Sequence, residues 1–367
     1  MADYQYDLPF DIMDVANILD IRIRRRGARS VYADCPFCGD SRGKLNLNLE
    51  KNVFRCNYCG VSGGAIAFYA MIHNIPNSTA YSEICEIVEG RYEKEKRSAI
   101  KKIKPKLPEM GKPVSLYERN QTYQMLCAML SLTKEHRRQL RLRGLSDEQI
   151  DRAGYRSTPV FGFDGFAKRL LEKGCAVEGV PGFYVKNNGT WTIHFSSRAS
   201  GIMIPYRTMS GAVSAFQIRL DNPFVDEKGH VTKYIWFSSV DNEKGVSSGS
   251  PAHFVGDPCD ETVFVTEGAL KADIANALSG RTFLAVAGVG NISSLQEPFA
   301  FLKKNGTKNI YECYDSDKFS NPHVKRGASA LVDMIKEFGF KPKIMKWDGS
   351  YKGIDDMLLS KKKEELK

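Results

Sequence analysis

Two pairs of closely spaced cysteines constrain the fold of this chain more than any other feature of its sequence. Cys35 and Cys38 form the first pair, Cys56 and Cys59 form the second, and 17 residues separate them. Each C-x-x-C can place two thiolates on one ion from a tight turn, so the pairs supply four soft ligands for tetrahedral Zn²⁺. The intervening sequence alternates apolar and polar residues, as a β-hairpin does. We therefore predict a zinc ribbon whose zinc is structural, because four thiolates leave no open coordination position.

The composition indicates an intracellular protein that binds a polyanion. The other five cysteines are scattered singly, which is typical of a reduced compartment and not of a disulfide framework. The sequence has no run of 18 apolar residues and no apolar signal-peptide segment, so we expect a cytoplasmic location and no membrane-spanning segment. Lys and Arg total 53 against 43 Asp and Glu, giving a net charge of +10. This surplus favours nucleic acid or a membrane surface as the partner.

Basic and aromatic side chains surround the cysteine pairs: Arg42, Lys44, Lys51 and Arg55, with Phe54 and Tyr58 near the second pair. Such a mixture suits single-stranded nucleic acid, whose phosphates are neutralised and whose bases stack on aromatic rings. We expect the basic residues to bind nucleic acid. For Phe54 we favour the simpler interpretation that the ring fills the small core of the ribbon.

The C-terminal part of the chain alternates predicted strands and helices. From Cys259 onward the apparent strands are TVFVTE, RTFLAVAG, KNIYECYD and KPKIMKW, and helix-like segments lie between them. Alternation at this spacing predicts a small parallel sheet covered by helices. Residues 182–237 contain shorter strand-like segments joined by Asn-Gly and Ser-Gly turns, which predict antiparallel hairpins.

Acidic residues follow the predicted strands of the α/β segment. Glu267 comes directly after one strand, and Asp315 and Asp317 come directly after another. Asp355 and Asp356 form a third acidic site after the final strand. Ligand sites in open α/β sheets gather at the carboxyl ends of strands. Carboxylate oxygens are hard ligands, so these acids suit Mg²⁺ shared with substrate phosphates.

In this order the motifs resemble a known protein family. The series TEG, YDSD and a downstream acidic pair resembles the Toprim domain of bacterial-type primases, topoisomerases and some nucleases. The ribbon CPFCG…FRCNYCG is similar to the zinc-binding domain of DnaG-type primases. The segments RGLSDEQIDRAGY, GIMIPYRTMSGAVSAFQIRL and KYIWFSS resemble parts of that family's polymerase domain. The resemblance covers most of residues 10–360.

The resemblance implies a multidomain α+β protein in which an N-terminal zinc ribbon is joined to an α/β, Toprim-containing primase catalytic core. The expected divisions are the zinc ribbon at 1–92, a charged linker at 93–114, the N-terminal part of the polymerase domain at 115–258, the Toprim domain at 259–350, and the acidic motif with a Lys-rich tail at 351–367.

The implied activity is template-directed synthesis of short RNA primers on single-stranded DNA. The resemblance assigns catalysis to five acids, of which the first three would hold Mg²⁺ or Mn²⁺: Glu267, Asp315, Asp317, Asp355 and Asp356. The basic residues expected to bind template or nucleotide are Arg207, Arg219, Lys233 and Lys271. Single-stranded DNA and NTPs are the expected partners, and a replicative helicase is a further candidate. We identify no helicase motor in the sequence, which favours a phage or mobile-element source.

Three departures from the family pattern leave alternatives open. All four zinc ligands are cysteines, whereas many cellular primases have one His. Lys271 replaces an acid found four residues after the Toprim glutamate, and Gly353 replaces the first acid of the final motif. A Toprim-type nuclease, which would degrade DNA without NTPs, is one alternative. A non-catalytic DNA-binding protein of replication or regulation is the other.

Overall fold

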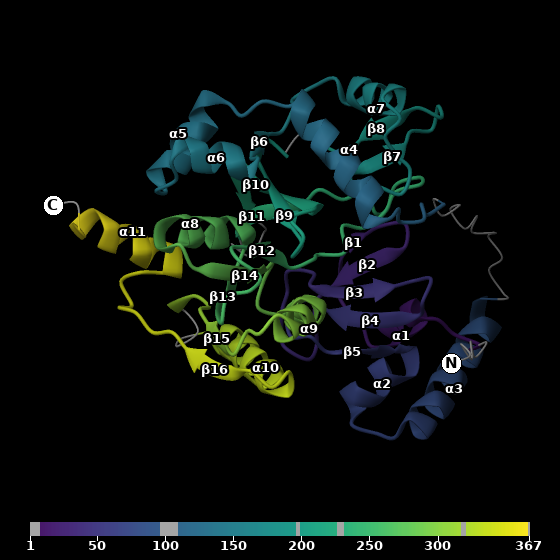
Figure 1. Cartoon of the computed structure of the whole chain (residues 1–367). Coiled ribbons are helices and arrows are strands. Elements are labelled where there is room, and N and C mark those ends of the chain that lie inside the picture. The colour runs from purple at the N-terminus through teal and green to yellow at the C-terminus, as the bar shows by residue number, and fades with distance from the viewer. Residues whose placement is uncertain (1–7, 96–108, 196–198, 226–230, 317–320, 366–367) are drawn as a thin grey trace. The chain divides into compact units, whose positions relative to one another are not determined.

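The computed structural model describes residues 8–95, 109–195, 199–225, 231–316 and 321–365. The chain forms two compact units (Figure 1). The first, called the ribbon unit here, comprises Met1–Pro108 and Asp226–His230, and its described part is residues 8–95. The second, called the core unit, comprises Glu109–Val225 and Val231–Lys367.

The ribbon unit is a five-stranded antiparallel sheet with three helices. Its strands pair in chain order: β1 (Ile23–Arg26), β2 (Ser30–Ala33), β3 (Leu45–Asn48), β4 (Val53–Cys56) and β5 (Ser62–Gly64). Its helices are α1 (Ile12–Ile18), α2 (Ala65–His73) and α3 (Asn77–Glu95). Strands β3 and β4 lie between the cysteine pairs and bury alternate residues, because side chains of a strand alternate between its two faces. The predicted hairpin is confirmed.

Phe54 lies in the core of the ribbon unit. Its side chain is 1% exposed, and its ring stacks on Phe68 with the ring centroids 4.5 Å apart. Phe37 stacks against it from 5.7 Å. Burial of this kind leaves no face of the Phe54 ring for a base, so the prediction that Phe54 fills the core is confirmed.

The N-terminal half of the core unit combines helices with antiparallel strands. The helices are α4 (Leu116–Met129), α5 (Lys134–Leu142), α6 (Asp147–Ala153) and α7 (Phe163–Glu172). One sheet has the order β11 (Val231–Trp236), β10 (Val213–Val225), β9 (Gly201–Arg207), β6 (Arg156–Ser157), and a hairpin pairs β7 (Phe183–Val185) with β8 (Trp191–Ile193). The antiparallel hairpins predicted for residues 182–237 are confirmed.

A second sheet of the core unit has the order β12 (His253–Val255), β14 (Thr282–Val286), β13 (Thr262–Glu267), β15 (Asn309–Glu312), β16 (Lys341–Ile344). The last four strands run parallel, as predicted, and β12 is an antiparallel edge strand. The sequence analysis missed β12, which is only three residues long. The helices around this sheet are α8 (Ala269–Ser279), α9 (Gln296–Lys304), α10 (Pro322–Glu337) and α11 (Ile354–Glu365), with a 3₁₀ turn at Ile292–Leu295.

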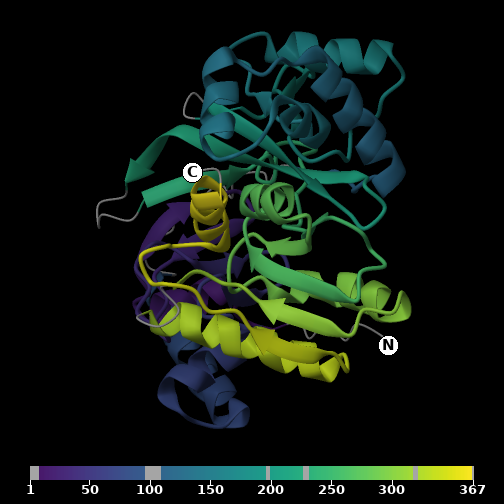
Figure 2. The same ribbon diagram turned by 60° about the vertical axis from the view of Figure 1, so that its left-hand side comes forward.

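Alternate residues of the parallel strands face two different helix layers. Val263 and Val265 pack on the side of α9 and α10, whereas Phe264 packs on the side of α8 and α11. Figure 2 shows this arrangement, with the sheet between the two pairs of helices. Burial on both faces explains why the strands are nearly continuous apolar runs. The carboxyl ends of β13, β14 and β15 therefore meet at one edge of a three-layer structure, where the predicted acids follow.

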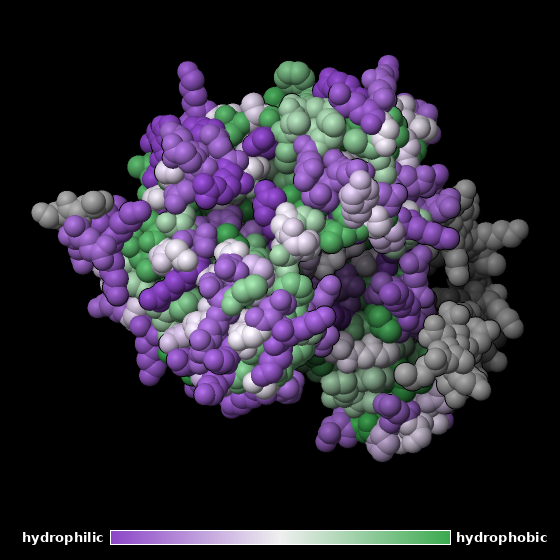
Figure 3. Space-filling model, in the orientation of Figure 1, coloured by the Kyte–Doolittle hydropathy of each residue, from purple (hydrophilic) through white to green (hydrophobic). Residues whose placement is uncertain are grey.

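The surface is largely hydrophilic where α5 and α6 lie, as Figure 3 shows. Within the described parts of the chain, no helix combines the length and the apolar character needed to cross a membrane.

Candidate functional site

The four paired cysteines converge in the ribbon unit. Their sulfur atoms all lie within 4.8 Å of one another, and the Cys35–Cys59 and Cys38–Cys56 sulfur distances are both 3.9 Å. Tetrahedral Zn–S bonds of about 2.3 Å place the sulfurs of one site about 3.8 Å apart. The backbone N–H of Tyr58 donates to the Cys56 sulfur over 3.4 Å. This geometry fits a closed zinc site.

The cysteine cluster already favours one thiolate. The hydrogen bond from the Cys35 thiol, with help from backbone N–H donors of Cys59 and Tyr58, lowers the pKa of Cys56 to about 5 against the opposing effect of burial. Burial raises the pKa of Cys59 to about 11. Zinc binds thiolates and releases their protons, so all four sulfurs would hold the ion as thiolates.

Basic side chains of the ribbon are partly engaged within the protein. Arg42 donates to Asp40, and its guanidinium lies 4.3 Å from the centroid of the Tyr58 ring. The predicted role of this basic cluster in nucleic-acid binding stays a prediction.

The predicted acids of the core unit gather around one lysine. Glu267 ends β13, and Asp315 follows β15, its parallel neighbour. Asp355 lies in the first turn of α11 and is 3% exposed. All three carboxylates act electrostatically on the Lys271 ammonium. We call Glu267, Asp315 and Asp355 the acid cluster.

The remaining predicted acids differ from these three. Asp356 is exposed, and its carboxylate accepts the backbone N–H of Gly353 over 3.4 Å. Asp317 lies outside the described residues, so its predicted position as a metal ligand stays a prediction.

Lys271 forms an ion pair inside the acid cluster. Its Nζ donates to the Asp315 carboxylate from α8, and its side chain is 17% exposed. Burial by itself lowers the pKa of Lys271, but Asp315, Asp355 and Glu267 more than offset this and raise it overall. The side chain is therefore a cation at neutral pH. The predicted role of Lys271 in binding substrate or DNA stays a prediction, although the ammonium is held by Asp315 here.

Arg143 completes the charge pattern, and the sequence analysis missed it. Its guanidinium donates to Asp355 from the end of α5, in the helical half of the core unit. The next residue, Gly144, has φ of +95°, and a Cβ there would come within 2.9 Å of the Leu359 side chain on α11. A glycine therefore lets this turn approach α11 closely. The single clue in the sequence was an Arg-Gly step following a basic helix.

Asp355 is deeply buried between two cations. Burial raises its pKa, and Arg143 and Lys271 only partly offset this. Its Oδ2 accepts from Arg143, while its Oδ1 is buried and makes no hydrogen bond within the described residues. A buried carboxylate oxygen without a donor is costly, so this oxygen is suited to a cation.

The predicted basic residues lie at two different places on one strand ladder. Arg219 pairs in register with Ile202 near the start of β9, and it lines a cavity of about 240 Å³ together with Arg143. Arg207 is at the other end of β9 and lines a separate cavity of about 620 Å³. Lys233 is exposed on β11. The structure therefore places Arg219 at the cavity that Arg143 also lines, where it donates to Gln139 over 3.0 Å, and places Arg207 at a separate cavity.

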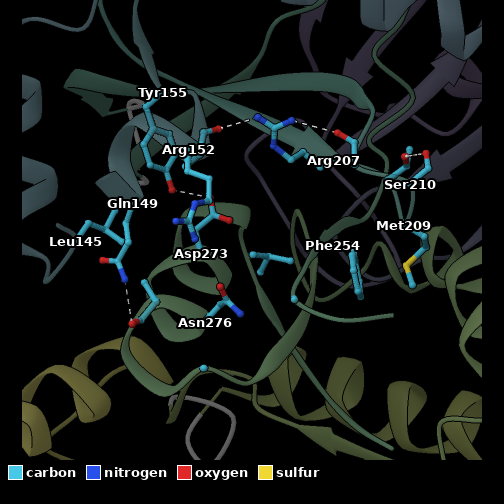
Figure 4. A pocket seen from close by; sticks show the side chains of 17 residues that line it. Leu145, Gln149, Arg152, Tyr155, Arg207, Met209, Ser210, Phe254, Asp273 and Asn276 are labelled. Carbon is cyan, nitrogen blue, oxygen red and sulfur yellow. Dashed lines mark hydrogen bonds between the residues drawn. The ribbon is translucent and has the colours of Figure 1, made fainter. Parts of the chain in front are cut away.

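The guanidinium of Arg207 forms hydrogen bonds with the backbone of two separate segments. It donates to the carbonyl oxygens of Ala153 over 3.0 Å and of Gly211 over 3.1 Å. Figure 4 shows it across the 620 Å³ cavity, which also holds the side chains of Arg152 and Asn276. The predicted contact of Arg207 with template or nucleotide stays a prediction.

Asp273 anchors a buried network beside this cavity. Its carboxylate accepts from the Tyr155 hydroxyl over 2.5 Å and lies 2.9 Å from Nε2 of His253. Tyr155 and His253 are 0% and 1% exposed. Asp273 is two residues from Lys271 on α8, so its side chain points in another direction and both its oxygens are engaged outside the acid cluster.

We expect Asp273→Ala to destabilise the core unit. Removing the carboxylate leaves the buried hydroxyl of Tyr155 and a ring nitrogen of His253 without their partner, at a cost of about 2–4 kcal/mol in the free energy of unfolding. Urea unfolding followed by tryptophan fluorescence measures this. Asp333→Ala is the control, because Asp333 is exposed on α10. Equal midpoints for the two variants would show that the network adds no stability.

Two family models match the chain. Residues 6–100 match the CHC2 zinc finger, and residues 255–365 match a domain of unknown function, DUF3854. The first match covers all four clustered cysteines and shows that they form a zinc finger. The second covers the parallel sheet, the acid cluster and α11.

Curated relatives and a solved structure agree with these matches. The DNA primase of Lactococcus lactis is 26% identical over 238 residues, which cover 60% of this chain and 34% of the relative. The DNA primase of Thermotoga maritima is 25% identical over 345 residues, covering 88% and 54%. The crystal structure of the Aquifex aeolicus primase, with its zinc-binding and RNA polymerase domains, matches with a TM-score of 0.51 at 19% identity, covering 98% of this chain and 82% of that one. The chain is thus similar to bacterial DNA primases in parts of its sequence, and its fold matches that of a primase of known structure.

This relationship confirms the predicted fold class, a zinc ribbon followed by a primase-type catalytic core. The chain spans about a third to a half of the length of these two curated proteins. The residue boundaries predicted within it stay predictions, as do the roles of its acids and basic residues.

Proposed function

We propose that the chain is a DNA primase that makes short RNA primers on single-stranded DNA during replication. One observation carries the proposal: in a chain with a primase fold, the carboxylates of Glu267, Asp315 and Asp355 all act on Lys271 near the carboxyl end of a parallel sheet, where Arg143 pairs with Asp355. The parallel sheet with its acids would be a Toprim domain. The reaction joins a primer 3′-hydroxyl to the α-phosphate of an incoming NTP and releases pyrophosphate.

The chemistry of the acid cluster suits Mg²⁺ or Mn²⁺, and its carboxylates would have to draw together around the ion, because the four cysteines are the one group of described residues whose ligand atoms already lie within 4.8 Å of one another. Carboxylate oxygens are the ligands that these hard ions prefer, and the buried Oδ1 of Asp355 makes no hydrogen bond within the described residues. Asp315 and Glu267 would hold the ion, with Asp317 as a further ligand and Asp356 at the rim. When bound, the ion neutralises phosphate charge and activates the hydroxyl.

The basic side chains would orient the nucleic acid and the triphosphate. Arg219 lines a cavity beside Arg143 at the edge of the cluster, and Lys233 is exposed on the neighbouring β11. Guanidinium and ammonium groups bind phosphates mainly by charge. We propose that they hold template and NTP, together with Arg207, while the basic face of the ribbon unit contacts single-stranded template. A cytoplasmic location and a replicative helicase partner belong to the same proposal.

A specific observation favours a second candidate. Lys271 is paired with Asp315, the central acid of the cluster, and a permanently occupied carboxylate would suit a DNA-binding protein without catalysis. A nuclease of the same architecture would use the ion without NTPs.

A primer-synthesis assay separates the three functions. The purified full chain is incubated with single-stranded DNA of mixed sequence, labelled NTPs and Mg²⁺ or Mn²⁺. Labelled oligonucleotides that require both template and NTPs are the expected result. Template degradation without NTPs would indicate the nuclease. DNA binding with no product on several templates would leave the non-catalytic protein as the better description.

A further inference from the structure

Lys271 forms a hydrogen bond with a carboxylate oxygen of Asp315 that would otherwise be available as a metal ligand. Its Nζ donates to Oδ1 of Asp315, and the two side chains are only 17% and 11% exposed. An exposed lysine would be free to move away into water, but this one leaves its ion pair only by crossing a buried, acidic environment. The contact is therefore largely shielded from water.

Gly353 gives the ammonium its space. A Cβ at this position would lie 3.0 Å from Nζ of Lys271 and 2.7 Å from Oδ1 of Asp355. Both distances are shorter than a Cβ tolerates without movement of its neighbours. Both Oδ1 of Asp355 and the Lys271 ammonium would have to give way to a side chain at residue 353. The glycine therefore leaves room for the ammonium beside Asp355 and Asp315.

Two resident cations offset part of the negative charge of the described site without any bound ion. Glu267, Asp315 and Asp355 supply three carboxylates, and Lys271 and Arg143 supply two cations. A cluster of three carboxylates attracts a divalent ion strongly, whereas the same cluster with a resident ammonium attracts it much less.

We propose that Lys271 is a resident cation of the acid cluster, and that a divalent ion binds only by displacing its ammonium from Asp315. This inference rests on the proposed function for the presence of a catalytic ion. The consequence is a weakened affinity for the ion, because each binding event must first break the Lys271–Asp315 ion pair.

Mn²⁺ titration followed by electron paramagnetic resonance tests the proposal. The full, zinc-loaded chain is titrated without DNA or nucleotide, and the signal of free Mn²⁺ reports the amount bound. We expect Lys271→Met to lower the Kd for Mn²⁺ at least tenfold, equivalent to about 1.4 kcal/mol. Lys271→Arg keeps the charge and is expected to bind Mn²⁺ as weakly as the unmodified chain.

Lys308→Met is the matched control. Lys308 precedes β15 at the other end of the same sheet, and it forms an exposed ion pair with Glu261. The control changes the net charge equally but leaves the cluster intact, so its Kd should not change. An unchanged Kd in Lys271→Met, or an equal decrease in Lys308→Met, would overturn the proposal.

Gly353→Ala tests the displacement of the ammonium in a protein that retains Lys271. It also provides a test of the proposal if Lys271→Met does not fold. The added methyl group should push the ammonium from Asp315 and lower the Kd in the same direction by a smaller factor. An unchanged Kd in folded Gly353→Ala protein would count against the resident cation.

The two proposals can fail separately. A lower Kd in Lys271→Met without primer synthesis by any variant would keep the resident cation and reject the primase. If the unmodified chain synthesised primers and all variants had the same Kd for Mn²⁺, the primase would be supported and the resident cation rejected.

Discussion

Primer synthesis by Asp315→Asn protein is expected to fall by at least roughly 10²–10³-fold. Asp315 is the cluster carboxylate that directly follows β15, and in the proposed mechanism it holds the ion that neutralises phosphate charge. The amide is nearly the same size, and Glu267 and Asp355 still act on Lys271. Asn at residue 315 leaves the Lys271 ammonium without its paired carboxylate, so we expect a lower melting temperature but a folded protein at the assay temperature. Labelled primer formed per minute and the melting temperature are measured on the same preparation.

Asp333→Asn provides the control for this experiment. It makes the same chemical change on α10, where the Asp333 side chain is 64% exposed and pairs only weakly with Lys336 over 3.9 Å. Its synthesis should match that of the unmodified chain. Retained synthesis in folded Asp315→Asn protein would reject the metal assignment, and loss of synthesis together with unfolding would mean that Asp315 is structural.

Removal of zinc is expected to unfold the ribbon unit and to leave the core unit folded. Structural zinc sites contribute about 10–16 kcal/mol of apparent binding free energy at neutral pH, more than a unit of this size gains from its core alone. Cys56→Ser removes the sulfur with the lowered pKa and should have the same effect as chelation. Hydrogen exchange resolved by segment should show loss of protection across residues 8–95 alone.

Cys85→Ser is the control for zinc removal. Cys85 belongs to the same unit and is half-buried, but it lies outside the four-sulfur cluster. Its exchange pattern should stay native. If the backbone amides of the ribbon unit stayed fully protected from hydrogen exchange after chelation, its small core would be sufficient to keep it folded. Zinc would then not be required for the folding of this unit.

The features that could be predicted were those encoded by local pattern. The paired cysteines lie in the turn that precedes β3 and at the turn that follows β4, at the open end of one hairpin, so their convergence follows from spacing. Glu267 and Asp315 could be placed together because parallel neighbouring strands end at the same edge. Strand–helix alternation likewise predicted the parallel sheet, and the brevity of β12 explains why that strand was missed.

The features that could not be predicted depend on contacts between distant segments. Arg143 reaches Asp355 across more than 200 residues of sequence, and no periodicity links an α5 terminus to α11. Lys271 and Gly353 looked like two unrelated departures from the family pattern. In the structure a Cβ at residue 353 would lie 3.0 Å from the Lys271 ammonium, so the two departures are parts of one local arrangement.

The docking of α11 also has a consequence for how the protein is made. Arg143, Lys271 and Asp315 are all synthesised before Asp355, which a ribosome adds about 40 residues after Asp315. Until α11 packs beside α8, Arg143 has no carboxylate and the cluster lacks its most buried oxygen. The site should therefore not mature gradually as the nascent chain emerges. It should become complete in one late step, when the twelve residues of α11 fold onto a scaffold that is already present.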